Sequence, residues 1–163
     1  MAAGKSTTAE ALALKLDKCV HLRGDVFRRM IASGREEMSA APSEEAVRQL
    51  HLRYRLTAEA AKTYFDGGFS VVVQDNYYGE ALPRMLRLLQ GYPVEAVVLP
   101  SLAAVKEREE KRAKTGYTGF SPEALYDAFL AETPRVGFWL DNTSLSPAQA
   151  ADAILRRCAG VNG

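Results

Sequence analysis

The start of the chain contains a short group of side chains whose types suit phosphate binding. Gly4, Lys5, Ser6 and Thr7 open a segment rich in alanine and leucine. A lysine can reach phosphate oxygens, and the N–H groups at the start of a helix attract anions. Gly-Lys-Ser is the second half of a Walker A phosphate loop, in which Lys5 would reach the β- and γ-phosphates of ATP and Ser6 would hold Mg²⁺.

The first half of this motif is not in the sequence. The full motif has an earlier glycine and a strand that leads into the loop, and both would have to precede Met1. We expect either that a longer natural protein supplies them or that this chain is a defective version. Gly4–Thr7 can also be a chance sequence that opens an ordinary helix, so the remainder of the chain must decide.

Two aspartates follow apolar segments that are predicted to be strands. Cys19–Leu22 is a short apolar run, and Asp25 lies just beyond it, where a helix is expected to start. Phe69–Val73 is a β-branched run typical of a parallel strand buried on both faces, and it is followed by Gln74 and Asp75. Open α/β sheets bind ligands at this end of their strands, so Asp75 resembles a Walker B acid that helps to place Mg²⁺. Asp25 can instead be no more than a helix cap.

A basic segment comes later in the chain. Arg108 and Arg112 lie on a helix expected over Leu102–Ala113, and residues 114–120 have the glycine- and threonine-rich composition of a mobile loop. The two arginines can neutralise a phosphoryl group. Alternatively, they form a solvated helix face paired with the glutamates at 107, 109 and 110.

The elements that must position these residues alternate along the chain. Strands are expected at Cys19–Leu22, Phe69–Val73, Val94–Leu99 and Gly137–Leu140. Helices are expected over Ser6–Leu16, Val26–Ile31, Glu80–Gln90 and Leu102–Ala113, from Ser43 to about Phe65, from Ser121 towards Glu132, and from Ser146 onwards. This alternation predicts right-handed βαβ units and a parallel sheet covered on both faces.

The long central helix shows the clearest periodicity. Its predicted buried stripe consists of Val47, Leu50, Tyr54, Ala58, Ala61 and Phe65. Gly67 and Gly68 are expected to end it. Most of its basic residues fall off the stripe, although Arg53 or Arg55 could face a substrate.

Composition excludes several classes of protein. The 163 residues, with 47% hydrophobic content, suit one domain covering 1–163. A net charge of +1 gives no electrostatic argument for nucleic acid or membrane. No apolar run approaches a transmembrane span, and Cys19 and Cys158 are expected to be free thiols or small buried hydrophobes in a cytoplasmic protein.

Together with Gly4–Ser6, four stretches resemble the small P-loop kinases of the chloramphenicol phosphotransferase and zeta-toxin type. They are His21–Arg29, Val71–Asp75, Arg108–Arg112 and Trp139–Ser144. The resemblance covers nearly the whole length and implies a three-layer P-loop NTPase fold with a mostly parallel sheet, whose first strand is missing from this chain. It implies a lid at about residues 108–120.

The resemblance also implies roles for individual residues. Asp25 would accept the proton of the substrate hydroxyl, with Arg28 and Arg29 beside the substrate. Arg108 and Arg112 would neutralise the phosphoryl group. Asp75 would lie on the Mg²⁺ or substrate side, and Asp141–Ser144 would lie near adenine.

The sequence therefore predicts an ATP- and Mg²⁺-dependent kinase that phosphorylates a hydroxyl of a small molecule, such as an antibiotic or a nucleotide-sugar-like metabolite. The alternative is a non-catalytic or weakly hydrolytic nucleotide-binding module. Retention of Asp25 speaks against this alternative, because a binder needs no base on the acceptor side. A polynucleotide kinase is disfavoured by the near-zero net charge.

Overall fold

The computed structural model describes residues 5–39, 41–99, 130–142 and 144–161. The elements in chain order are α1 (Lys5–Ala13), β1 (Cys19–Arg23), α2 (Asp25–Arg29), α3 (Glu44–Asp66), β2 (Ser70–Gln74), α4 (Ala81–Leu88), β3 (Val97–Val98), β4 (Phe138–Trp139) and α7 (Pro147–Val161). The predicted alternation of strands and helices is confirmed over these residues. The helix expected at Leu102–Ala113 lies outside them. Within them, no helix is long and apolar enough to cross a membrane.

β1 and β2 form a parallel pair, as predicted. The register runs from Cys19 opposite Ser70 to Arg23 opposite Gln74. All residues of β2 retain some solvent exposure, however, so the expectation of a strand buried on both faces is wrong. The physical reason is that β2 pairs with one strand only in the described part, which leaves its other edge uncovered by a sheet neighbour.

β3 and β4 form a second parallel pair, with Val97 opposite Phe138. Both strands are shorter than predicted. β4 begins only at Phe138 because Gly137 has a positive φ of 76°, which interrupts an extended strand. Gly137 also approaches Ala96 so closely that a Cβ there would lie 2.2 Å from the Ala96 carbonyl oxygen.

The described residues thus form two half-sheets instead of one sheet. In β2, the hydrogen bonds from Ser70 N to Lys18 O (2.7 Å) and from Gly24 N to Gln74 O (3.0 Å) show which residues bond to β1. In a parallel ladder the alternate residues, Val71 and Val73, direct their backbone groups to the opposite edge. Among the described strands, none pairs with β2 on this opposite edge.

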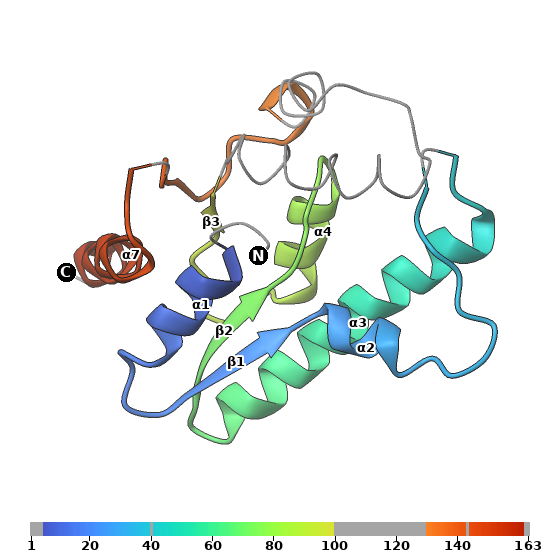
Figure 1. Ribbon diagram of the computed structural model, residues 1–163. Helices are drawn as coiled ribbons and strands as arrows, with labels where there is room; N and C mark the ends of the chain where they lie inside the picture. The colour runs from blue at the N-terminus through green and yellow to red at the C-terminus, as the bar shows by residue number, and fades with distance from the viewer. Residues whose placement is uncertain (1–4, 40, 100–129, 143, 162–163) are drawn as a thin grey trace.

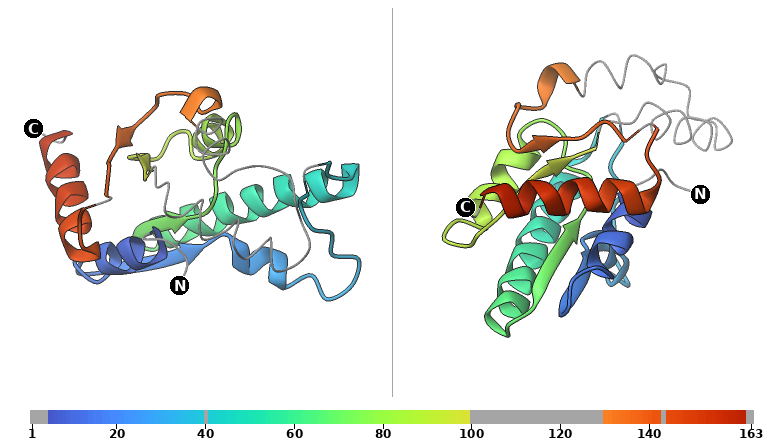
Figure 2. Two further views of the ribbon diagram at one scale, coloured as in Figure 1. Left: turned by 45° about the horizontal axis from the view of Figure 1, so that its top comes forward. Right: turned by 90° about the vertical axis from the view of Figure 1, so that its left-hand side faces the viewer.

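β1 and β2 form the middle one of three layers. α3 and α4 cover one face, where Leu22, Ala58, Ala61, Met85 and Leu89 form the buried core. α1 lies on the other face and packs against α7 (Figures 1 and 2). This arrangement confirms the predicted three-layer α/β architecture.

α3 follows its predicted boundaries closely. The Ser43 hydroxyl accepts a hydrogen bond from Ala46 N at 3.0 Å and caps the start of the helix. Gly67 caps its end, and Gly68 has a φ of 80° that favours glycine. Tyr54 is buried as predicted, but Phe65 is 41% exposed, because the last turn of α3 runs past the core.

α7 begins with a capping box. Gln149 N donates to the Ser146 hydroxyl at 3.2 Å, and the Gln149 side chain accepts from Ser146 N at 2.9 Å. α1 ends at Ala13 instead of Leu16, because the backbone there tightens into bonds three residues apart, from Lys15 to Leu12 and from Leu16 to Ala13. Cys19 and Cys158 are free thiols, as predicted.

Candidate functional site

The carboxyl ends of β1 and β2 bring the two predicted aspartates to the same edge of the sheet. Gly24 joins β1 to Asp25, and Gly24 N donates to Gln74 O, the residue before Asp75. A Cβ on Gly24 would lie 2.2 Å from Asp75 Oδ2 and 3.1 Å from the Thr57 hydroxyl. The absence of a side chain at Gly24 therefore allows Asp75 to pack directly beneath the start of α2.

Asp25 is the first residue of α2, and its side chain is 40% exposed. The cap position belongs to Gly24, and there is no side-chain capping hydrogen bond. Asp25 is thus an acidic residue of the first helical turn, next to the cap position. Its carboxylate accepts a hydrogen bond from Arg29 one turn later and remains accessible to a ligand at the sheet edge.

The two neighbouring arginines point to different partners. Arg29 pairs with Asp25, whereas Arg28 pairs with Glu37 in the loop that precedes α3. Both arginines were predicted to lie near the substrate. Only Arg29 contacts Asp25, the candidate base.

Asp75 is buried, with a side chain that is 2% exposed. Its Oδ2 lies 3.1 Å from Arg53 Nε on α3, and its Oδ1 accepts a hydrogen bond from Asn76 N at 2.7 Å. The contact with Arg53 is close enough for an ion pair but lacks the alignment of a hydrogen bond. Sequence reasoning left Arg53 and Arg55 undistinguished. The useful signal is that Arg53 lies one helical turn before Thr57, which is buried beside Gly24.

Two tyrosines complete the surroundings of Asp75. Tyr54 and Tyr77 lie with ring centroids 5.3 Å apart, and the Tyr54 hydroxyl donates to Asn76 O at 3.1 Å. Burial raises the pKa of both hydroxyls, and the charge of Asp75 raises them further. Both tyrosines are therefore neutral donors near neutral pH.

The first turn of α1 lies towards the same edge, because α1 runs antiparallel to β1 (Figure 1). α1 begins at Lys5, with Lys5 and Ser6 partly buried and Thr7 exposed. Helix-start amides, an ammonium and a hydroxyl are a donor set that fits a nucleotide phosphate chain. Gly4 lies outside the described residues.

The remaining predicted site residues are also outside the described part of the chain. They are Arg108, Arg112 and the lid expected at residues 108–120. Within the described part, no group of three histidine, cysteine or acidic residues is arranged to hold a metal ion. Ser6, in the first turn of α1, carries a hydroxyl oxygen of the kind that binds Mg²⁺ together with nucleotide phosphates.

Two solved structures share this fold. The tunicamycin resistance protein of Deinococcus radiodurans matches with a TM-score of 0.66 and 17% identity, over 95% of this chain and 88% of its own. A Chloroflexus aurantiacus protein, provisionally described as a kinase, matches with a TM-score of 0.62 and 17% identity, over 96% of this chain and 90% of its own. No curated protein matches the chain.

The sequence profile of an AAA domain family matches residues 1–135, which include α1, both aspartates and all strands up to β3. The match covers the elements that form the sheet edge described above and agrees with the P-loop fold of the two structures. The chain therefore belongs to this AAA domain family and has its P-loop kinase-like fold.

Proposed function

We propose that this protein is an ATP- and Mg²⁺-dependent phosphotransferase that acts on a hydroxyl group of a small molecule. The observation that carries the proposal is the shared sheet edge, where Asp25 is accessible and the first turn of α1 presents Lys5 and Ser6. A phosphoryl donor and an acceptor hydroxyl must meet at one place, and this edge offers groups suited to each.

On the nucleotide side, the start of α1 would bind the phosphates. Gly4, Lys5, Ser6 and Thr7 would contact them, and the Ser6 hydroxyl would hold Mg²⁺. ATP supplies the γ-phosphoryl group. Asp75 would lie on the Mg²⁺ or substrate side, and in the described arrangement it pairs with Arg53 next to the start of α2.

On the acceptor side, the oxygen of the acceptor hydroxyl would attack the γ-phosphorus, and Asp25 would accept the proton of that hydroxyl. The bond between the γ-phosphorus and the β–γ bridging oxygen would break. Arg29 would orient the carboxylate of Asp25, and Arg28 would line the approach to it. Arg108 and Arg112 would neutralise the charge of the phosphoryl group in transit.

The class of acceptor is proposed from one of the two similar structures. The Deinococcus radiodurans relative is named for tunicamycin resistance. We therefore propose a small hydroxylated molecule, such as an antibiotic, as the acceptor.

Replacement of Asp25 tests the proposal. Asp25→Asn keeps the size of the side chain but removes the anionic proton acceptor. We expect fold and ATP binding to persist while phosphoryl transfer falls by roughly 10²–10⁴-fold, the usual contribution of a positioned base. Transfer of labelled γ-phosphate to tunicamycin, other hydroxylated antibiotics and nucleotide sugars is the measurement.

Asp17→Asn is the matched control, because Asp17 is an exposed aspartate in the turn after α1, away from the proposed base. It should retain full activity. Full activity in Asp25→Asn would exclude Asp25 as the base. Calorimetric ATP binding without transfer to any acceptor in the wild-type protein would instead favour the nucleotide-binding module.

A further inference from the structure

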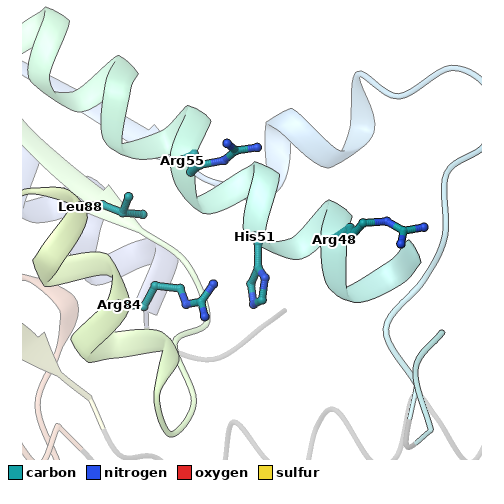
Figure 3. A pocket seen from close by; sticks show the side chains of 5 residues that line it. All are labelled: Arg48, His51, Arg55, Arg84 and Leu88. Carbon is teal, nitrogen blue, oxygen red and sulfur yellow. The ribbon is translucent and has the colours of Figure 1, made fainter. Parts of the chain in front are cut away.

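A pocket of about 390 Å³ lies between α3 and α4, apart from the aspartates of the sheet edge. Its lining consists of Arg48, His51 and Arg55 of α3 and Arg84 and Leu88 of α4 (Figure 3). Leu88 packs against the core and is the apolar residue of the pocket lining. The size is within the range of about 300–1,000 Å³ that is usual for small-molecule sites.

The walls of this pocket are cationic. Figure 3 shows the His51 imidazole beside the Arg84 guanidinium in the space between the two helices. No carboxylate is among the described residues that line it. Arg48 is compensated by Glu44 at 3.7 Å and Glu45 at 2.7 Å.

Arg55 and Arg84 differ in this respect from most described arginines. Arg23, Arg28, Arg29, Arg35, Arg48, Arg53 and Arg157 each have a carboxylate partner. Within the described ranges, Arg55 and Arg84 have none, and the same is true of Arg87, Arg135 and Arg156, which do not line the pocket. Like charges gathered around a concave surface repel one another, and a bound anion would relieve that repulsion.

Arg84 also influences the titration of His51. Burial lowers the pKa of His51, and the charge of Arg84 lowers it further. An anion in the pocket would act in the opposite direction and favour the imidazolium form.

The pocket is separate from the candidate catalytic edge. With 3.6 residues per turn, Arg48, His51 and Arg55 share one side of α3, whereas Arg53 points to Asp75 from the other flank of the buried stripe. A ligand in the pocket would therefore not need to displace the ion pair between Arg53 and Asp75.

We propose that the pocket lined by His51, Arg55 and Arg84 binds the phosphate group of a small molecule. Guanidinium groups match phosphate oxygens in geometry, and a protonated His51 adds a donor that favours a dianion over a single carboxylate. The volume leaves space for the organic part of a phosphate monoester beside Leu88. This site does not depend on the proposed phosphoryl transfer.

Histidine NMR gives a local test, because the chain has 2 histidines and His21 on β1 serves as an internal reference. The probes are inorganic phosphate, glucose 6-phosphate and citrate. Either phosphate probe should shift the His51 signals and raise the pKa of His51, while the His21 signals stay in place. Arg84→Gln and Arg55→Gln should each weaken this response by about tenfold or more.

Two control variants make the outcome decisive. Arg87→Gln removes an exposed arginine of α4 that does not line the pocket, and it should leave binding unchanged. Lys5→Ala should also leave the His51 response intact, which separates this site from the start of α1. The proposal is overturned if the His51 signals respond to citrate alone or to no probe, or if folded Arg84→Gln binds phosphate as the wild type does.

Discussion

At the scale of single residues, Gly24 decides how the candidate site is built. Its φ of −60° is open to any residue, so its importance lies in space and not in backbone freedom. The carboxylate of Asp75 occupies the place where a side chain would begin. The absence of a Cβ at Gly24 thus lets Asp75 approach the backbone that leads into Asp25.

We predict that Gly24→Ala destabilises the protein. The new methyl group would lie 2.2 Å from Asp75 Oδ2, and such overpacking costs about 1–3 kcal/mol of unfolding free energy. Urea unfolding measures the change. Gly160→Ala in α7 is the control, because a Cβ there meets open space, and it should not destabilise the protein. Equal stability of Gly24→Ala and the wild type would contradict the packing argument.

A second prediction concerns His21 and the pH dependence of the free energy of unfolding. Burial lowers the pKa of His21 below the ordinary 6.5, Arg23 lowers it further, and Gln74 and Glu10 partly oppose the shift. The folded state thus favours the neutral imidazole, and the unfolded chain binds the proton more readily. His21 therefore contributes stability above about pH 6.5 that is lost as pH falls through its lower folded pKa.

The measurement is the free energy of unfolding at pH 7.5 and pH 5.5 for the wild type and for His21→Gln. Carboxylates titrate similarly in both proteins, so the difference between them isolates His21. We expect the loss of stability on acidification to be smaller in the variant. An identical loss in the two proteins would show that His21 titrates alike in the folded and unfolded states.

At the scale of elements, α3 contributes side chains to two separate sites, one on each flank of its buried stripe. On one flank Arg53 pairs with Asp75, and on the other His51 and Arg55 line the cationic pocket. The stripe between them, which includes Tyr54 and Ala58, is buried. The helix therefore fixes the distance between the candidate catalytic edge and the pocket.

The positions of Arg53 and Arg55 on these two flanks predict losses of stability of very different size for the same substitution. Arg53→Gln leaves the buried Asp75 carboxylate, 2% exposed, without its cation, and should cost about 3–5 kcal/mol. Arg55→Gln, on the exposed flank, should change stability by no more than about 0.5 kcal/mol. Thermal and urea unfolding of the two variants would settle the comparison. A loss in Arg55→Gln as large as that in Arg53→Gln would refute this division of α3.

At the scale of the whole molecule, the division of the sheet is the dominant feature. β1 with β2 and β3 with β4 are both parallel pairs. Val71 and Val73 direct backbone groups away from β1, and Val97 directs its own away from β4, because Ala96 O and Val98 O accept the bonds from β4. These edges can each accept a further parallel strand.

We predict that a strand of about five apolar residues, followed by a glycine loop and joined ahead of Gly4, raises both stability and ATP affinity. The loop amides would add phosphate contacts, and we expect ATP to bind about tenfold or more tightly. Calorimetry and thermal unfolding compare the extended and present chains. An extension of the same length made of glycine and serine is the control. Equal affinity for ATP in all three proteins would contradict the prediction.

The sequence by itself determined the element order, because that information is local. The β-branched run before Asp75, the cap at Ser43 and the glycines after Asp66 act within a few residues of themselves, and the structure reproduces their boundaries. The order of motifs was likewise sufficient to predict the P-loop kinase-like fold, which the family match confirms.

The tertiary structure decided which side chains meet. Pairing of Arg53 instead of Arg55 with Asp75 depends on the rotation of α3 over the sheet, and the length of β3 depends on its contact with β4. The cationic pocket needs two helices whose basic residues are distant in sequence. Such contacts depend on the packing of the whole chain, and periodicity along one element cannot specify them.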